Sequence, residues 1–87
     1  MALLSELMVW KHVDSKSAVR YCCFHDLKNN KYAVQSADFF SLPVDEKQLR
    51  FLNIQFLELL METSPSERCT WYPSVEDAIA AHDDLFS

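Results

Sequence analysis

The sequence predicts a small α+β domain, with a short antiparallel sheet in the order β-β-β-α-β-α and two helices packed on one face. Three patterns carry this prediction: an alternating, aromatic-rich stretch over 18–40, a long apolar helical stretch over 45–63, and an amphipathic stretch after Pro73. At 87 residues the chain suits a single domain spanning 1–87, and it shows no repeat, low-complexity tract or linker.

Residues 18–40 are expected to form a β-hairpin, because apolar and polar residues alternate on both sides of the pair Asn29-Asn30. Asparagine tolerates positive φ better than most residues, so it suits a tight turn in a chain that has no glycine. A two-residue turn at this pair would place His25 opposite Val34.

The stretch before the hairpin fits two structures. Residues 8–13 are expected to form a strand that joins the hairpin through 14–17 and completes a three-stranded meander. The alternative is that residues 2–13 contain a helix that starts near Ala2.

A long helix is expected from Asp45 to Thr63. Asp45 followed by Gln48 fits a capping box, and Ser64-Pro65 ends the helical pattern. The apolar residues form two adjoining stripes, which cover more of the circumference than the single stripe of an ordinary surface helix. One stripe contains Leu49, Leu52, Phe56, Leu59 and Leu60, and the other contains Phe51, Ile54, Leu57 and Met61.

The C-terminal part predicts a short strand followed by a second helix. Residues 68–72 are expected to form the strand, and Ser74 is expected to cap the helix after Pro73. The apolar side of this helix recurs at helical spacing and contains Val75, Ala78, Ile79, His82, Leu85 and Phe86.

Composition excludes several classes of function. Thirteen acidic and eight basic side chains give a net charge of −5 with no basic cluster, so we expect no nucleic-acid binding. No apolar run is long enough to span a bilayer, and the N-terminus lacks the positive segment of a signal peptide. Three cysteines, two of them adjacent, do not form a disulfide framework, so we expect a soluble, cytoplasmic protein.

The chain contains no glycine, although average usage of about 7% would give about six. Phosphate-binding loops, Rossmann turns and nucleophile elbows need glycine for close backbone approach or unusual dihedral angles. This absence excludes most glycine-dependent nucleotide and hydrolase chemistry, but it leaves metal and carboxylate chemistry open.

His82 is the main candidate for catalysis, because it lies within the apolar side of the last helix. We expect instead a histidine at the margin of the core, since intermediate burial is usual for this residue. Cys23 and His25 share one strand face and, with Cys69 and His82, could form a Cys2His2 site. Paired ligand spacings such as C-x2-C are missing, so we predict no metal, no cofactor and no catalytic residue.

The second stripe of the long helix is the strongest positive signal for function. The hairpin can cover one stripe, and the other needs the C-terminal helix or another protein to cover it. We predict an interface that contains Phe51, Ile54, Leu57, Met61, Trp71 and Tyr72, most simply in a two-fold homodimer.

These observations together predict a non-catalytic protein-interaction or regulatory module. An acidic inhibitor or immunity-type protein that covers a basic partner would have this size and charge. Two alternatives remain open at this point: a small enzyme that uses His82 with a nearby Cys or Asp, and a Cys/His metal-binding domain.

Overall fold

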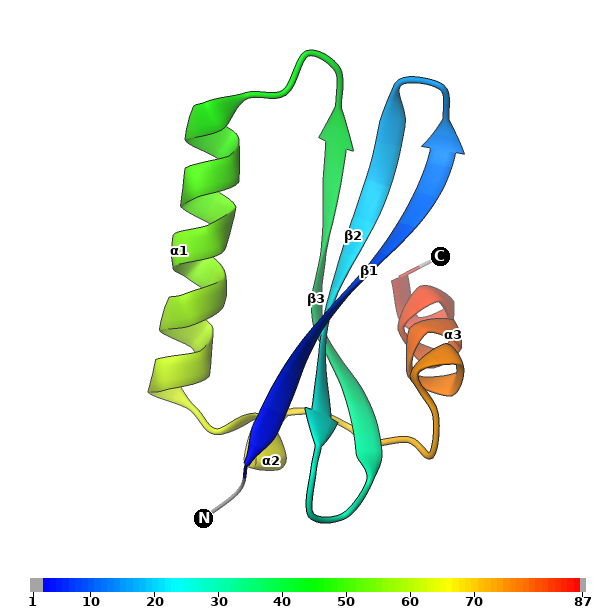
Figure 1. The fold of residues 1–87 in the computed structure, drawn as a ribbon, viewed down its shortest axis with the longest axis vertical. Coiled ribbons are helices and arrows are strands. Elements are labelled where there is room, and N and C mark those ends of the chain that lie inside the picture. The colour runs from blue at the N-terminus through cyan, green and yellow to red at the C-terminus, as the bar shows by residue number, and fades with distance from the viewer. Residues whose placement is uncertain (1–2, 87) are drawn as a thin grey trace.

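The structure is a computed structural model that describes residues 3–86. Three strands come first, and three helices follow them (Figure 1). The strands are β1 (Leu4–Asp14), β2 (Ser17–Asp26) and β3 (Lys31–Ser41), and the helices are α1 (Glu46–Glu62), α2 (Pro65–Arg68) and α3 (Val75–Phe86). The predicted α+β class with an antiparallel sheet is confirmed.

The three strands form one antiparallel sheet in the order β1-β2-β3. The ambiguous N-terminal segment is therefore a strand from Leu4 onward. Because β2 lies in the centre, its middle residues are the most buried of the chain, and both Cys22 and Cys23 are fully buried. The buried centre is a cluster around β2 and α1, made of Cys22, Phe24 and Phe56, with Leu4, Leu60 and Trp71 packed against it.

The hairpin turn is longer than the two residues predicted. Asp26 pairs with Lys31, so the connection spans the four residues 27–30, and His25 faces Tyr32 rather than Val34. A two-residue turn is not needed, because a side chain at the end of β2 organises the longer loop.

That side chain is the carboxylate of Asp26. It accepts hydrogen bonds from the backbone N–H groups of Lys28 at 3.0 Å and Asn29 at 3.2 Å, and from the Asn29 side chain at 3.0 Å. These hydrogen bonds hold the pKa of the Asp26 carboxyl below its usual value, and the one from the Asn29 side chain has the largest effect. Asn30 then closes the loop with a φ of 54°, the positive value that the sequence predicts for this pair.

The predicted strand at 68–72 is absent from the described part of the chain. Pro65 starts the short helix α2, and Cys69 N still donates to Pro65 O at 2.9 Å. Tyr72 pairs with the backbone of the sheet, through a single antiparallel bridge to Tyr32. The bridge does not extend into a ladder, because the chain turns into α3 directly after it, with Ser74 as the cap.

The two long helices contact opposite faces of the sheet, rather than the one face expected. Phe56 of α1 stacks on Phe24, with ring centroids 5.5 Å apart, whereas His82 of α3 meets Tyr21 edge-on at 6.1 Å. Successive strand residues point to opposite faces, so Phe24 and Tyr21 place the helices on either side of the sheet (Figure 1). Each face is therefore covered by one helix.

Helix α1 begins as predicted, with Asp45 accepting hydrogen bonds from the backbone N–H groups of Lys47 and Gln48. The Gln48 side chain does not complete a capping box; it donates to Phe39 O of β3 at 3.3 Å. Ser74 caps α3 through a hydrogen bond from Asp77 N at 3.1 Å, also as predicted. Within residues 3–86, no helix is long and apolar enough to cross a membrane.

Replacing Asn30 with glycine tests the turn. Because Asn30 has a φ of 54°, Asn30→Gly should leave stability unchanged or raise it by up to about 1 kcal/mol. Asn29→Gly is the matched control, and it should be destabilising because it removes the side chain that donates to Asp26. Denaturant unfolding measures both; a clear loss of stability in Asn30→Gly would show that the positive φ is not the controlling feature.

Candidate protein-interaction surface

The second apolar stripe of α1 is exposed to solvent. Its residues are between half and four-fifths exposed: Phe51 64%, Ile54 52%, Leu57 56% and Met61 78%. We call these four residues the α1 outer stripe. The other stripe packs on the sheet through Phe56, which is only 9% exposed. The C-terminal helix does not cover the α1 outer stripe, because α3 contacts the opposite face of the sheet.

The surface of α1 is hollowed along and beside this stripe. A shallow hollow of about 320 Å³ is lined by Ile54, Leu57 and Met61, with Glu58 and Glu62 at its rim. A second, wider groove of about 620 Å³ follows the neighbouring flank of the helix and includes Ile54 and Leu57 again. Both hollows are open and shallow. This shape is typical of a surface that receives the side chains of another protein.

A second apolar area lies on the sheet, on the same face as α1 but nearer β1. Trp10 is 55% exposed, and its ring lies 5.9 Å from that of Phe40. Met8 is 36% exposed two residues away, on the same side of β1. The loop after β3 adds two further exposed side chains. We call this area the open sheet patch; it consists of Met8, Trp10, Phe40, Leu42 and Val44.

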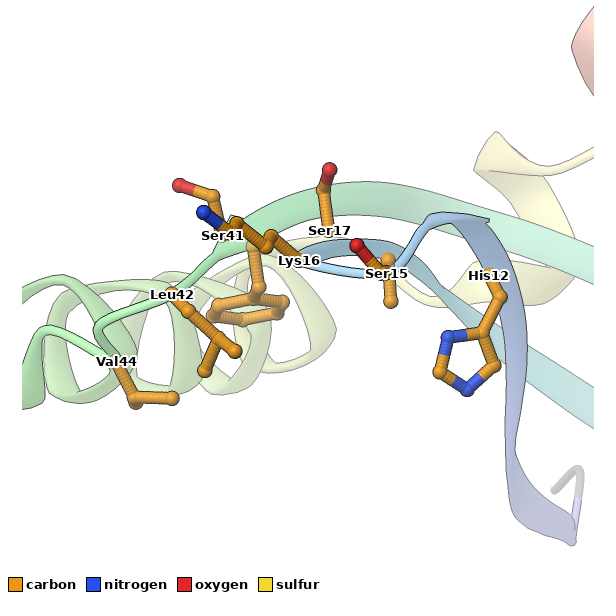
Figure 2. Close-up of a pocket in the computed structure, with 9 residues that line it drawn as sticks. His12, Ser15, Lys16, Ser17, Ser41, Leu42 and Val44 are labelled. Carbon is orange, nitrogen blue, oxygen red and sulfur yellow. The ribbon is translucent and has the colours of Figure 1, made fainter.

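The upper end of the open sheet patch borders a pocket of about 220 Å³. Figure 2 shows Leu42 and Val44 close together on one side of this pocket and His12 on the other. Lys16 also lines it, so the rim of this end of the patch is basic. Sequence analysis did not identify these residues as a surface; the available signal was the alternation that puts Met8 and Trp10 on one side of β1.

Two residues predicted to belong to the interface lie elsewhere. Trp71 is half-buried and packs against the core around Phe24 and Phe56. Tyr72 is half-buried as well, and its backbone pairs with Tyr32. The structure therefore brings together the four predicted residues of α1, but it does not add Trp71 and Tyr72 to them.

The structure places His82 and Cys69 in the lining of one pocket of about 200 Å³, between β3, α3 and the segment after α2. This is the pair that the enzyme alternative requires. Burial raises the pKa of the Cys69 thiol, so the nucleophilic thiolate is disfavoured at neutral pH. His82 is half-buried with its ring against Tyr21, which is the arrangement expected of a histidine at the margin of the core.

Cys23 and His25 share the α3 face of β2, but they do not form a site. Cys23 is fully buried, and burial raises the pKa of its thiol to about 11. His25 stacks on Tyr32 with ring centroids 4.3 Å apart, and its Nε2 is hydrogen-bonded to Asn30 Oδ1 at 2.8 Å. Across residues 3–86, no three His, Cys, Asp or Glu side chains gather closely enough to hold a metal ion.

Comparisons with protein-family models, with curated proteins and with solved structures find no match to this chain. We therefore infer a function from the geometry of the two apolar surfaces and of the pocket beside His82.

His82→Gln separates a packing role from a catalytic one. The ring of His82 contacts Tyr21 edge-on, so the variant should lose about 0.5–1.5 kcal/mol of unfolding free energy. Its self-association should be unchanged, because α3 lies on the face opposite α1. Thermal and denaturant unfolding measure the first effect and light scattering the second. Unchanged stability together with loss of a biological activity would instead identify His82 as a catalytic residue.

Proposed function

We propose that this protein is a non-catalytic protein-interaction module and that the α1 outer stripe is its binding surface. The observation that carries the proposal is the exposure of four large apolar side chains along one side of a single helix. Scattered exposed apolar residues are common on protein surfaces, but a contiguous row of this kind is typical of a contact with another protein.

The exposed stripe is large for a chain of 87 residues. Each large apolar side chain left in water forgoes about 1.5–3 kcal/mol relative to full burial. The total stability of a domain is only about 5–15 kcal/mol. The four side chains of the α1 outer stripe are 52–78% exposed, so their burial in an interface supplies part of this burial free energy for each of them, against the cost of association.

We propose a second copy of the chain as the partner, related by a two-fold axis. A two-fold contact uses the same surface of both chains, so the surface of one chain that contains the stripe supplies both sides of the interface. The charges beside the stripe suit two antiparallel helices. Lys47 and Arg50 outweigh Glu46 in the first half of α1, whereas Glu58 and Glu62 make the second half acidic. Antiparallel helices therefore bring a basic half to the height of an acidic half.

The charge of the chain supports a regulatory role for the dimer toward a basic partner. Each chain carries a net charge of −5, and such a field attracts basic proteins and repels nucleic acids. The three cysteines are free, and two of them are buried, which supports the reducing environment of the cytoplasm.

Light scattering at micromolar concentration tests the proposal. The wild-type chain of 10.1 kDa should scatter with about twice that mass. Ile54→Asp should shift it to the monomer, because a carboxylate in the middle of a buried apolar stripe is strongly unfavourable. Gln55→Asp is the matched control, since it adds the same charge next to the stripe, and it should remain dimeric.

Circular dichroism must show that Ile54→Asp is still folded, which we expect because Ile54 is 52% exposed in the single chain. A wild-type protein that stays at 10.1 kDa over this concentration range contradicts the dimer.

A further inference from the structure

The α1 outer stripe points away from the sheet that α1 packs on. Ile54 and Phe56 are two residues apart, which is about 200° around an α-helix. Because Phe56 stacks on Phe24, the side of α1 that carries Ile54 faces almost directly outward. The α1 outer stripe therefore cannot reach the open sheet patch of its own chain.

The open sheet patch is exposed because α1 lies toward the other edge of the sheet. Two side-chain hydrogen bonds tie α1 to β3, one from Gln48 to Phe39 O and one from Gln35 to Phe56 O. A helix is about 10 Å wide, and neighbouring strands lie about 4.8 Å apart, so a helix over β3 leaves β1 uncovered. Met8 and Trp10 remain exposed on the α1 face for this reason.

We propose that these two surfaces cover each other in the dimer: the α1 outer stripe of each copy lies on the open sheet patch of the other. This inference rests on the proposed function and specifies the geometry of its contact. The two α1 helices then lie side by side and antiparallel, as one layer between two sheets. Each α1 packs with its Phe56 side on its own sheet and with its Ile54 side on the sheet of the second copy.

The positions of Trp10 and Ile54 along the strand direction fit this arrangement. Arg20 donates a hydrogen bond from Nη1 to Asn53 Oδ1 at 3.1 Å, and Arg20 is the β2 residue that pairs with Trp10. Trp10 therefore lies level with the part of α1 that contains Ile54. A two-fold axis at this height places Ile54 of the second copy over Met8 and Trp10.

The charges at the end of the open sheet patch fit as well. Leu42 N donates to Lys16 O, so the β1–β2 turn lies beside the start of α1. In an antiparallel pair, the second copy's α1 ends near this turn. The acidic residues of its last turns, Glu58 and Glu62, then lie near the ammonium group of Lys16. The hollow between Ile54 and Met61 is available for an apolar side chain of the patch.

Disulfide trapping between two different chains tests this geometry. One chain carries Met8→Cys and the other carries Ile54→Cys, both with Cys69→Ser so that the half-buried thiol does not react. When the two are mixed and mildly oxidised, the covalent heterodimer should form at least tenfold faster than with the control pair. The control replaces Met8→Cys with Leu85→Cys, a position that is 78% exposed but lies on α3.

The outcomes separate this geometry from the proposed function. If light scattering shows a dimer but the Ile54→Cys chain is oxidised only with itself, the outer stripes face each other, and the inference on the open sheet patch is overturned. If no pair reacts faster than the control and the chain is monomeric, the proposed function fails as well. Rapid reaction of the Met8→Cys chain with the Ile54→Cys chain, in a dimer of twice the chain mass, supports both.

Discussion

The stacking of Phe56 on Phe24 determines where α1 lies, and the rest of the surface depends on it. Phe24 is 2% exposed in the second half of the central strand, and the ring of Phe56 covers it from the helix. Once Phe56 takes that position, the helical repeat turns Ile54 and Met61 to the outside. The same contact, reinforced by hydrogen bonds to β3, leaves Trp10 uncovered on β1. Both exposed apolar surfaces thus follow from one packing interaction.

A buried ion pair works together with this packing. Arg20 Nη2 of β2 lies 2.8 Å from Asp38 Oδ2 of β3, and the two side chains are 8% and 10% exposed. Arg20 also donates a hydrogen bond to Asn53 of α1. A buried ion pair adds little to stability when compared with an apolar pair of the same size, but breaking it is costly. We attribute to it the position of α1 along the sheet, because this position brings Asn53 Oδ1 within hydrogen-bond distance of Arg20 Nη1.

The sequence predicted the features that depend on local pattern. The α+β class, the start of α1 at Asp45 and the exposed positions of the α1 outer stripe follow from periodicity and capping. The features that were not predicted depend on particular side-chain hydrogen bonds within short segments and on ring contacts between residues distant in the sequence. The four-residue loop results from the hydrogen bonds of the Asp26 carboxylate, and the missing fourth strand results from α2 and the turn into α3. The two helices lie on opposite faces because Phe56 and His82 contact strand residues that point to opposite sides of the sheet. Within the candidate surface, the part of the sheet that α1 leaves open could be identified only once the position of α1 was known.

In the proposed dimer, the helix of each copy and the sheet of the other cover the apolar surface that the single chain leaves exposed. Trp10 is the most direct reporter, because it is 55% exposed in the single chain and lies in the proposed contact. Trp71→Phe leaves Trp10 as the one tryptophan of the chain. The emission of this variant, recorded from nanomolar to high micromolar protein concentration, should shift to shorter wavelength as the indole becomes buried in the dimer. Emission that stays at the wavelength of a water-exposed indole over the whole range would contradict the account.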